Sequence, residues 1–209
     1  MTTSEAPRDA GRRRFLRIAG GTGAVWALAA CSAGGRGAAP AAYGGELRAL
    51  ALAAALENQA AGVYRAALTA ARAGRLGTVP AETQAFLTTA AAHHTAHAEE
   101  WNAALRRAGK PPVTGVPLTD HAEVTAALER ARSASETAAL ALRLEERAAR
   151  THLLAACGAR GAPGIATAAA IAPAEAAHAA TLRLLLGQDP VPDAFLRVEG
   201  AARAALLTV

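Results

Sequence analysis

The chain has 209 residues, of which 52% are hydrophobic and only 3% are aromatic, and its net charge is +5 at pH 7. This length suits one domain with its own core and is short for two. β-Branched and aromatic residues are sparse outside short runs, so strands are not expected. The composition therefore predicts an all-α protein whose core is built from small side chains on helices.

The first thirty residues resemble an export signal. Arg12 and Arg13 lie in GRRRFLRIAG, which is similar to a twin-arginine signal, and the uncharged run that follows is short for a transmembrane helix. The run ends in LAAC, which resembles a bacterial lipobox, so Cys31 would be acylated and become the mature N-terminus. The resemblance implies a lipid-anchored protein on the outer face of the cytoplasmic membrane. An ordinary signal with an incidental cysteine would leave the protein periplasmic or extracellular.

Removal of residues 1–30 changes the charge balance. It leaves 17 basic and 15 acidic residues, a net charge of +2. No basic stripe remains to neutralise phosphates, so nucleic acid is not an expected partner. The membrane is the expected partner through the lipid. The sequence identifies no protein partner and allows a homodimer. With Cys31 lipidated, Cys157 has no disulfide partner, and we interpret it as a small buried hydrophobe near a helix end.

The rest of the chain divides into a flexible tether over 31–45, a helical bundle over 46–198 and a C-terminal tail over 199–209. The tether is rich in glycine and small residues. Glycine and proline residues interrupt the helical runs and so predict four long helices in the bundle, over about 46–72, 81–108, 133–157 and 165–186. The connection between the second and third helices is long and proline-rich, as a crossover requires, and a short helix is expected after Asp120.

Two local features refine these helices. Ser133 and Glu136 are spaced like a capping box at the start of the third long helix. Pro173 lies inside the fourth, where it should kink the helix or mark a restart, because proline lacks a backbone donor. The turn-rich segment GQDPVPDAFLRV follows and is expected to lie over the bundle.

The two halves of the bundle repeat one pattern. LENQAAGVY aligns with LEERAARTH, and HTAHA aligns with EAAHA. Residues three apart on a helix lie about 60° apart around its axis, and residues seven apart differ by about 20°. The aligned polar residues are therefore expected on the inner faces of their helices; they are Glu57 and Tyr64, Glu145 and His152, His94 and His97, and Glu175 and His178.

Four helices with a glutamate on the first and third and a Glu-x-x-His pattern on the others resemble the ferritin-like carboxylate bundles. In particular, AAAIAPAEAAHAATLRLLLG followed by PVPDAF is similar to a bacterial group of exported ferritin-like domain proteins, and the resemblance covers about residues 46–198. It implies an up-down four-helix bundle with a metal site inside. The implied ligands are Glu57, His97, Glu145, Glu175 and His178.

His94 departs from the family pattern, which has glutamate there. When His94 is included, the candidate metal ligands are Glu57, His94, His97, Glu145, Glu175 and His178. Imidazole cannot bridge two ions as carboxylate does, and three glutamates do not balance two divalent cations. The second ion should therefore bind weakly or not at all.

Several neighbours have secondary interpretations. Tyr64 is a core residue or a phenol behind the ligands, and His152 is a further ligand or a hydrogen-bond partner of one. His93 competes with His94 for the inward position, although an exposed His93 is favoured. The remaining residues are expected outside the site: Glu99, Glu100 and Glu146 in solvent, with Glu100 as the spare carboxylate, and Trp101 at a bundle end.

These ligands suit iron or manganese, as one or two ions, and also zinc. The resemblance implies an oxygen- or peroxide-dependent oxidoreductase, although the sequence leaves open whether the protein is an enzyme. The alternative is a non-catalytic helical bundle with a binding or structural role in the cell envelope. Its buried residues would then form a proton-sharing hydrogen-bond cluster, the remnant of a lost site. A ferritin-style storage shell fits poorly with a lipid anchor on every subunit.

Overall fold

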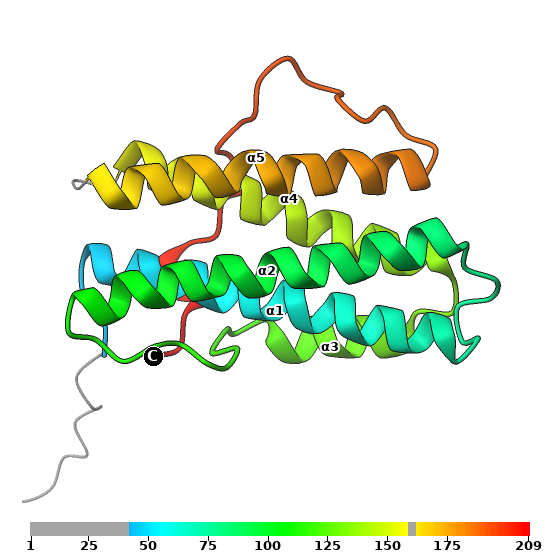
Figure 1. Cartoon of the computed structure of the whole chain (residues 1–209), viewed down its shortest axis with the longest axis horizontal. Coiled ribbons are helices and arrows are strands. Elements are labelled where there is room, and N and C mark those ends of the chain that lie inside the picture. Colours follow the sequence, from blue (N-terminus) through cyan, green and yellow to red (C-terminus); the bar gives the residue numbers. More distant parts are fainter. Residues whose placement is uncertain (1–41, 159–161) are drawn as a thin grey trace, which may run out of the picture. The chain divides into compact units, whose positions relative to one another are not determined.

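The computed structural model describes residues 42–158 and 162–209. Arg12, Arg13 and Cys31 lie outside the described residues, as does most of the predicted tether. The helices are α1 (Glu46–Arg72), α2 (Ala81–Arg107), α3 (His121–Arg130), α4 (Ala134–Gly158) and α5 (Ala162–Leu185), followed by the 3₁₀ turn η1 (Ala204–Leu206) (Figure 1). In the described part of the chain, none of these helices has the length and apolarity needed to span a membrane.

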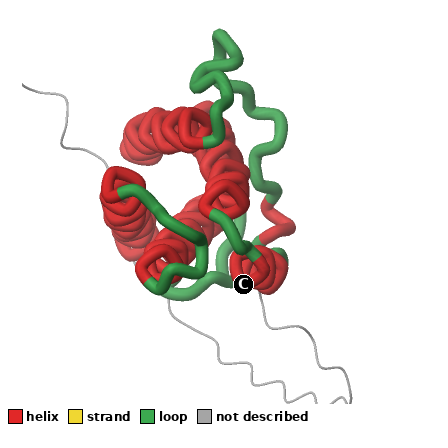
Figure 2. The backbone as a smooth tube through the Cα atoms, turned by 90° about the vertical axis from the view of Figure 1, so that its right-hand side faces the viewer, coloured by secondary structure: helices red, strands yellow, loops and turns green. Residues whose placement is uncertain are grey.

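The four long helices form a bundle with a long crossover, which confirms the predicted all-α fold class, and their directions run up-down-down-up. α1 packs along α2 and α4 packs along α5, and the two hairpins meet through α1 and α4, while α2 and α5 pack least closely (Figure 2). Between α2 and α4 the chain returns along the length of the bundle, and α3 lies on this crossover against α1 and α4 (Figure 1). This return path gives α1 and α4 opposite directions.

The helix ends follow local chemistry. α1 ends before Gly74, whose φ of 72° is accessible to glycine at little cost. At the start of α4, the Ser133 hydroxyl accepts a hydrogen bond from the Glu136 N–H at 3.1 Å, as in a capping box. The Glu136 carboxylate instead reaches back to the Arg132 N–H at 2.6 Å, one residue earlier than the motif requires. α5 continues through the exposed Pro173 without a restart.

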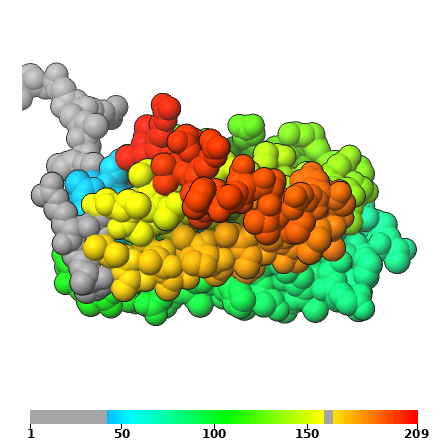
Figure 3. Space-filling view, turned by 90° about the horizontal axis from the view of Figure 1, so that it is seen from above, coloured from blue at the N-terminus to red at the C-terminus, as the bar shows by residue number. Residues whose placement is uncertain are grey.

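The C-terminal residues, predicted as a tail, belong to the fold. Leu207 is buried in the core and pairs with Leu118 of the crossover. Arg48 on α1 donates hydrogen bonds to three carbonyl oxygens of the C-terminal segment, with the shortest at 2.7 Å to Leu207. The preceding segment crosses the outer side of α4 and α5, as expected (Figure 3), and leaves the Phe195 side chain 83% exposed.

Cys157 is exposed, so the prediction that it is buried was wrong. The inner face of α4 is marked by His152, which is fully buried. Five residues further along a helix, a side chain points about 140° away from that face. Cys157 therefore falls on the outer side of the last turns of α4.

The two largest apolar clusters of the described residues lie on either side of a polar layer. One cluster gathers at the end of the bundle where α1 begins, with Leu52, Trp101 and Ile171 among its members. The other lies at the opposite end, around Leu87 and Leu182. The charged side chains of the bundle interior meet between these clusters.

Candidate metal centre

Six side chains from four helices meet in the polar layer. They are Glu57 of α1, His94 and His97 of α2, Glu145 of α4, and Glu175 and His178 of α5. Five of them are buried, and His97 is partly exposed. The structure thus brings together every residue of the predicted metal set, because the spacing of three residues places both members of each α2 and α5 pair on one face.

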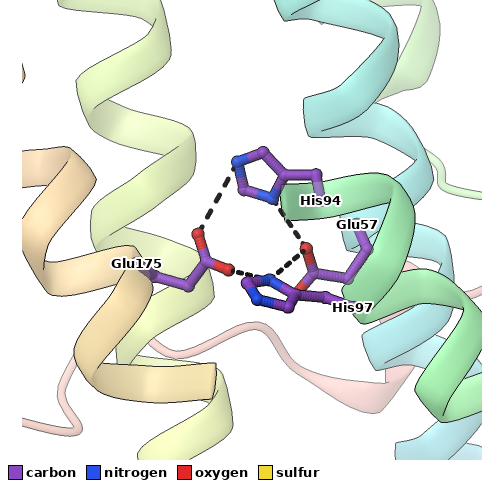
Figure 4. A group of neighbouring side chains, drawn as sticks. All are labelled: Glu57, His94, His97 and Glu175. Atoms are coloured by element: carbon purple, nitrogen blue, oxygen red, sulfur yellow. Dashed lines mark hydrogen bonds and ion pairs between the residues drawn. The ribbon is translucent and has the colours of Figure 1, made fainter. Parts of the chain in front are cut away.

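The first group of ligand atoms joins α1, α2 and α5 (Figure 4). It comprises Glu57, His94, His97 and Glu175, whose ligand atoms lie within 4.8 Å of one another. His97 Nδ1 is 2.7 Å from Glu175 Oε1 and 3.6 Å from Glu57 Oε2. His94 Nδ1 is 2.7 Å from the same Glu57 oxygen. Two carboxylates and two imidazoles therefore face one point.

The second group joins α2, α4 and α5. It comprises His94, Glu145, Glu175 and His178, again within 4.8 Å of one another. His94 Nε2 is 2.9 Å from Glu145 Oε1, and His178 Nδ1 is 3.3 Å from Glu175 Oε2 and 3.5 Å from Glu145 Oε2. His94 and Glu175 belong to both groups, so the two groups are neighbours. Each ring nitrogen of His94 faces a different carboxylate.

Tyr64 and His152 connect the two halves in a reciprocal way. The Tyr64 hydroxyl on α1 donates a short hydrogen bond to Glu145 on α4. His152 on α4 contacts Glu57 on α1, with Nε2 2.5 Å from Oε1. Tyr64 and His152, which occupy equivalent positions in the repeat, thus each bond to the glutamate of the other half. Both lie behind the carboxylates, which agrees with their expected role as partners of ligands.

Trp101 packs near one end of the bundle, as expected, in the apolar cluster that contains Leu52 and Ile171. Its ring lies over His152, with the ring centroids 5.5 Å apart and the planes 10° apart. Since His152 contacts Glu57, Trp101 packs behind a hydrogen-bond partner of a candidate ligand, and sequence reasoning missed this contact. Spacing along α2 places Trp101 one turn beyond His97, but its partner on α4 follows only from how the two helices pack.

His93 is exposed, as expected, and His94 takes the inward position. Sequence reasoning nevertheless missed a contact of His93. Its Nδ1 lies 3.0 Å from Nε2 of His178, across the junction of α2 and α5. The signal available in the sequence was a histidine one residue before the inward position of α2.

The other acidic neighbours lie outside the site. Glu99 and Glu100 are exposed, and Glu99 pairs with Arg106. Glu146 is partly buried and binds Arg150 and Arg183 instead of facing the bundle interior. Glu145 is therefore the inward glutamate of α4, as the repeat indicated.

The histidines keep two of the three buried glutamates ionised. Burial alone would raise the pKa of Glu57, but hydrogen bonds from His152, His94 and His97 hold it well below its usual value. Burial opposes ionisation of Glu145 in the same way, but the charge of His94, the nearby imidazole of His178 and the bond from His94 lower its pKa. At Glu175 burial prevails and the pKa is raised.

The carboxylates in turn favour protonated histidines. Burial would lower the pKa of His97 and His178, but hydrogen bonds to glutamates raise both to about 9. The pKa of His94 is raised well above its ordinary value, against the effect of burial, by the charge of Glu145 and by bonds to Glu145 and Glu57. The metal-free site is thus a network of carboxylates and imidazolium groups.

The donor set fits a divalent transition metal. Carboxylate oxygen and imidazole nitrogen are ligands of iron, manganese and zinc alike. Glu145 Oε2 is buried without a hydrogen bond in the described part of the chain, since His178 Nδ1 lies 3.5 Å away. A cation between His178 and the two α4 and α5 glutamates would satisfy this oxygen. Metal binding would require His97 and His178 to lose the protons that face the carboxylates.

Comparison with protein families identifies a match. The family model described as ferritin-like domain matches residues 45–188. No curated protein and no solved structure matches the chain. The matched range covers α1 to α5 and all six side chains of the candidate metal centre.

Proposed function

The chain belongs to the ferritin-like domain family, and on this basis we propose that its polar layer binds iron or manganese, with zinc as a competing ion. The observation that carries this proposal is the presence of two adjoining groups of buried ligand atoms, each within 4.8 Å. Six side chains from four helices converge there although isolated buried carboxylates are costly.

The residues of the polar layer would have different roles in metal binding. An ion could be held by Glu57 and His97 or, at the neighbouring position, by Glu145 and His178, and Glu175 belongs to both groups. Bound iron or manganese would supply one-electron chemistry towards oxygen or peroxide. Tyr64 and His152 would orient the carboxylates through their hydrogen bonds. The two apolar clusters would exclude water from both ends of the layer.

His94 limits the number of metal ions that the polar layer can bind. When neutral, imidazole offers one lone pair, so His94 can serve one ion only. Its two nitrogens face Glu57 and Glu145 at 2.7 Å and 2.9 Å. Protonated, it acts as an internal cation between the carboxylates that two metal ions would otherwise neutralise. We therefore expect occupancy of one ion or less.

A non-catalytic bundle is the second candidate, and one observation favours it. Each of the three buried glutamates already has a histidine partner without any metal. Such a network can be stable as a hydrogen-bond cluster. The protein would then serve a binding or structural role in the cell envelope.

We further propose that the protein reaches the envelope through the twin-arginine route and stays there through a lipid on Cys31. The support is the sequence alone, with Arg12 and Arg13 at the start of the signal and LAAC at its end. Twin-arginine export suits proteins that fold, and load their metal, before they cross the membrane.

Elemental analysis beside an optical spectrum of protein purified without chelators tests the metal proposal. We expect iron or manganese in the unmodified chain and in Glu100→Gln, whose carboxylate is exposed. Glu57→Gln should lose most of the metal because it removes a buried ligand charge. Absence of metal from the unmodified chain, even after incubation with each ion, would favour the non-catalytic bundle.

A further inference from the structure

His93 crosses the least closely packed junction of the bundle. α2 and α5 approach each other less than the other neighbouring long helices do, and His93 projects from the α2 side of this junction. The side chain is exposed, yet Nδ1 lies 3.0 Å from Nε2 of His178 on α5. The ring planes are 18° from parallel, so an N–H in the plane of one ring can point at the lone pair of the other.

The direction of this hydrogen bond follows from the other side of His178. Nδ1 of His178 faces Glu175 and Glu145 at 3.3 Å and 3.5 Å. To bind an ion there, Nδ1 must carry a lone pair, and the only ring proton then sits on Nε2. Nε2 is the atom beside His93, so His93 Nδ1 must accept.

We propose that His93 is a positioning residue of the metal centre: it accepts the Nε2 proton of His178 and so keeps the Nδ1 lone pair directed at Glu145 and Glu175. This inference rests on the proposed metal binding. A metal-ligating histidine generally donates its second N–H to a fixed acceptor, and loss of that acceptor typically costs 10- to 100-fold in metal affinity.

The two halves of the site differ in this respect. In the internal repeat, His94 and His97 align with Glu175 and His178, so His93 aligns with Ala174. Alanine has no acceptor in its side chain, and the repeat therefore provides no counterpart of His93 for His97. Removal of His93 should weaken the ion held by Glu145 and His178 and spare the group of Glu57 and His97.

Two substitutions of His93 distinguish the effect of a hydrogen-bond acceptor from the effect of side-chain size. Nδ1 of histidine and Oδ1 of asparagine are each two bonds beyond Cβ, so His93→Asn keeps an acceptor in place. His93→Leu keeps an apolar side chain of similar reach without one. His121→Leu removes another exposed histidine, at the start of α3, and controls for metal bound loosely by surface imidazole.

The full-length chain, purified in detergent, would be titrated with Co²⁺ by calorimetry and by its visible absorption, which reports on nitrogen ligands. We expect a 10- to 100-fold loss of affinity at one site in His93→Leu, most of it restored in His93→Asn and none in His121→Leu. In metal-free protein labelled with ¹⁵N-histidine, His93→Leu should also change the chemical shift of His178 Nε2, whereas His93→Asn should change it less.

The outcomes distinguish the two proposals. Equal Co²⁺ affinity in the unmodified chain and in His93→Leu, or an asparagine variant no better than leucine, would overturn the role of His93 and leave metal binding intact. Failure of the unmodified chain to bind Co²⁺, Mn²⁺ or Zn²⁺ would overturn both. Because the side chain is exposed, both variants should fold, and circular dichroism checks this.

Discussion

Replacement of His94 by glutamate should convert a site for one ion into a site for two. In the structure His94 lies between Glu57 and Glu145, fully buried, with ring nitrogens at 2.7 Å and 2.9 Å from their oxygens. The substitution removes an internal cation and adds a fourth carboxylate. It thereby supplies the charge that balances two divalent ions and a ligand able to bridge them.

Without metal, the same substitution should destabilise the protein. Loss of one partner from a buried ion pair costs about 3–5 kcal/mol. Two like charges about 4 Å apart repel by about 4 kcal/mol at an effective dielectric constant of 20, although protonation of one carboxyl relieves part of this. For a domain of this size, a loss of 3–5 kcal/mol corresponds to a melting temperature lower by roughly 6–20 °C.

Metal should reduce this difference. One ion at 100 times its Kd stabilises the folded state by about 2.7 kcal/mol, and two ions by about twice as much. The assay is thermal unfolding with and without Mn²⁺ or Zn²⁺, with stoichiometry from calorimetry. His94→Gln is the matched control, because it removes the imidazole without adding a charge and should gain no second ion.

Two tight sites in the unmodified chain would refute the charge argument. So would a His94→Glu variant that binds no more metal than His94→Gln while remaining folded. Absence of binding in all three proteins would instead support the non-catalytic bundle.

Three further predictions concern export, pH and the C-terminus. Replacement of Arg12 and Arg13 by lysine should retain the protein in the cytoplasm. Cys31→Ser should release it from the membrane fraction, and fractionation of cells checks both results. The pKa values of His97 and His178 are about 9 in the folded protein, and the ordinary value is 6.5. The two histidines therefore stabilise the metal-free fold fully below pH 6.5, and this contribution should disappear as the pH rises through 9. Urea unfolding as a function of pH measures it. Metal affinity should instead rise over this range, by about tenfold per pH unit for each proton displaced. Arg48→Ala should cost about 1–3 kcal/mol and make the C-terminus sensitive to proteases, because three carbonyl oxygens lose their donor.

The helices and the inward set could be predicted because the relevant signals are local. Long alanine- and leucine-rich runs end at glycine and proline, and spacings of three and seven residues fix which side chains share a face. The internal repeat supplied an independent check, and it anticipated that Tyr64 and His152 occupy equivalent positions.

Contacts that depend on how two helices pack could not be predicted in this way. Periodicity places His93 on the outer side of α2, but its bond to His178 depends on the approach of α5. The stacking of Trp101 on His152 has the same origin. Burial of Leu207 depends on the return of the chain end to α1, for which the sequence carries no periodic signal.

The polar layer has a consequence for how the two hairpins find their alignment. Alanine-rich helix surfaces are smooth, so one hairpin could slide along the other by a turn, about 5.4 Å, with little change in apolar contact. Such a slip would separate Glu57 from His152, and Glu145 from Tyr64 and His94, so both carboxylates would lose the buried partners that the other hairpin supplies. Loss of one partner from a buried ion pair costs about 3–5 kcal/mol, a large part of the stability of a typical domain. The bonds that hold the candidate ligands thus also select a single register from several of nearly equal packing.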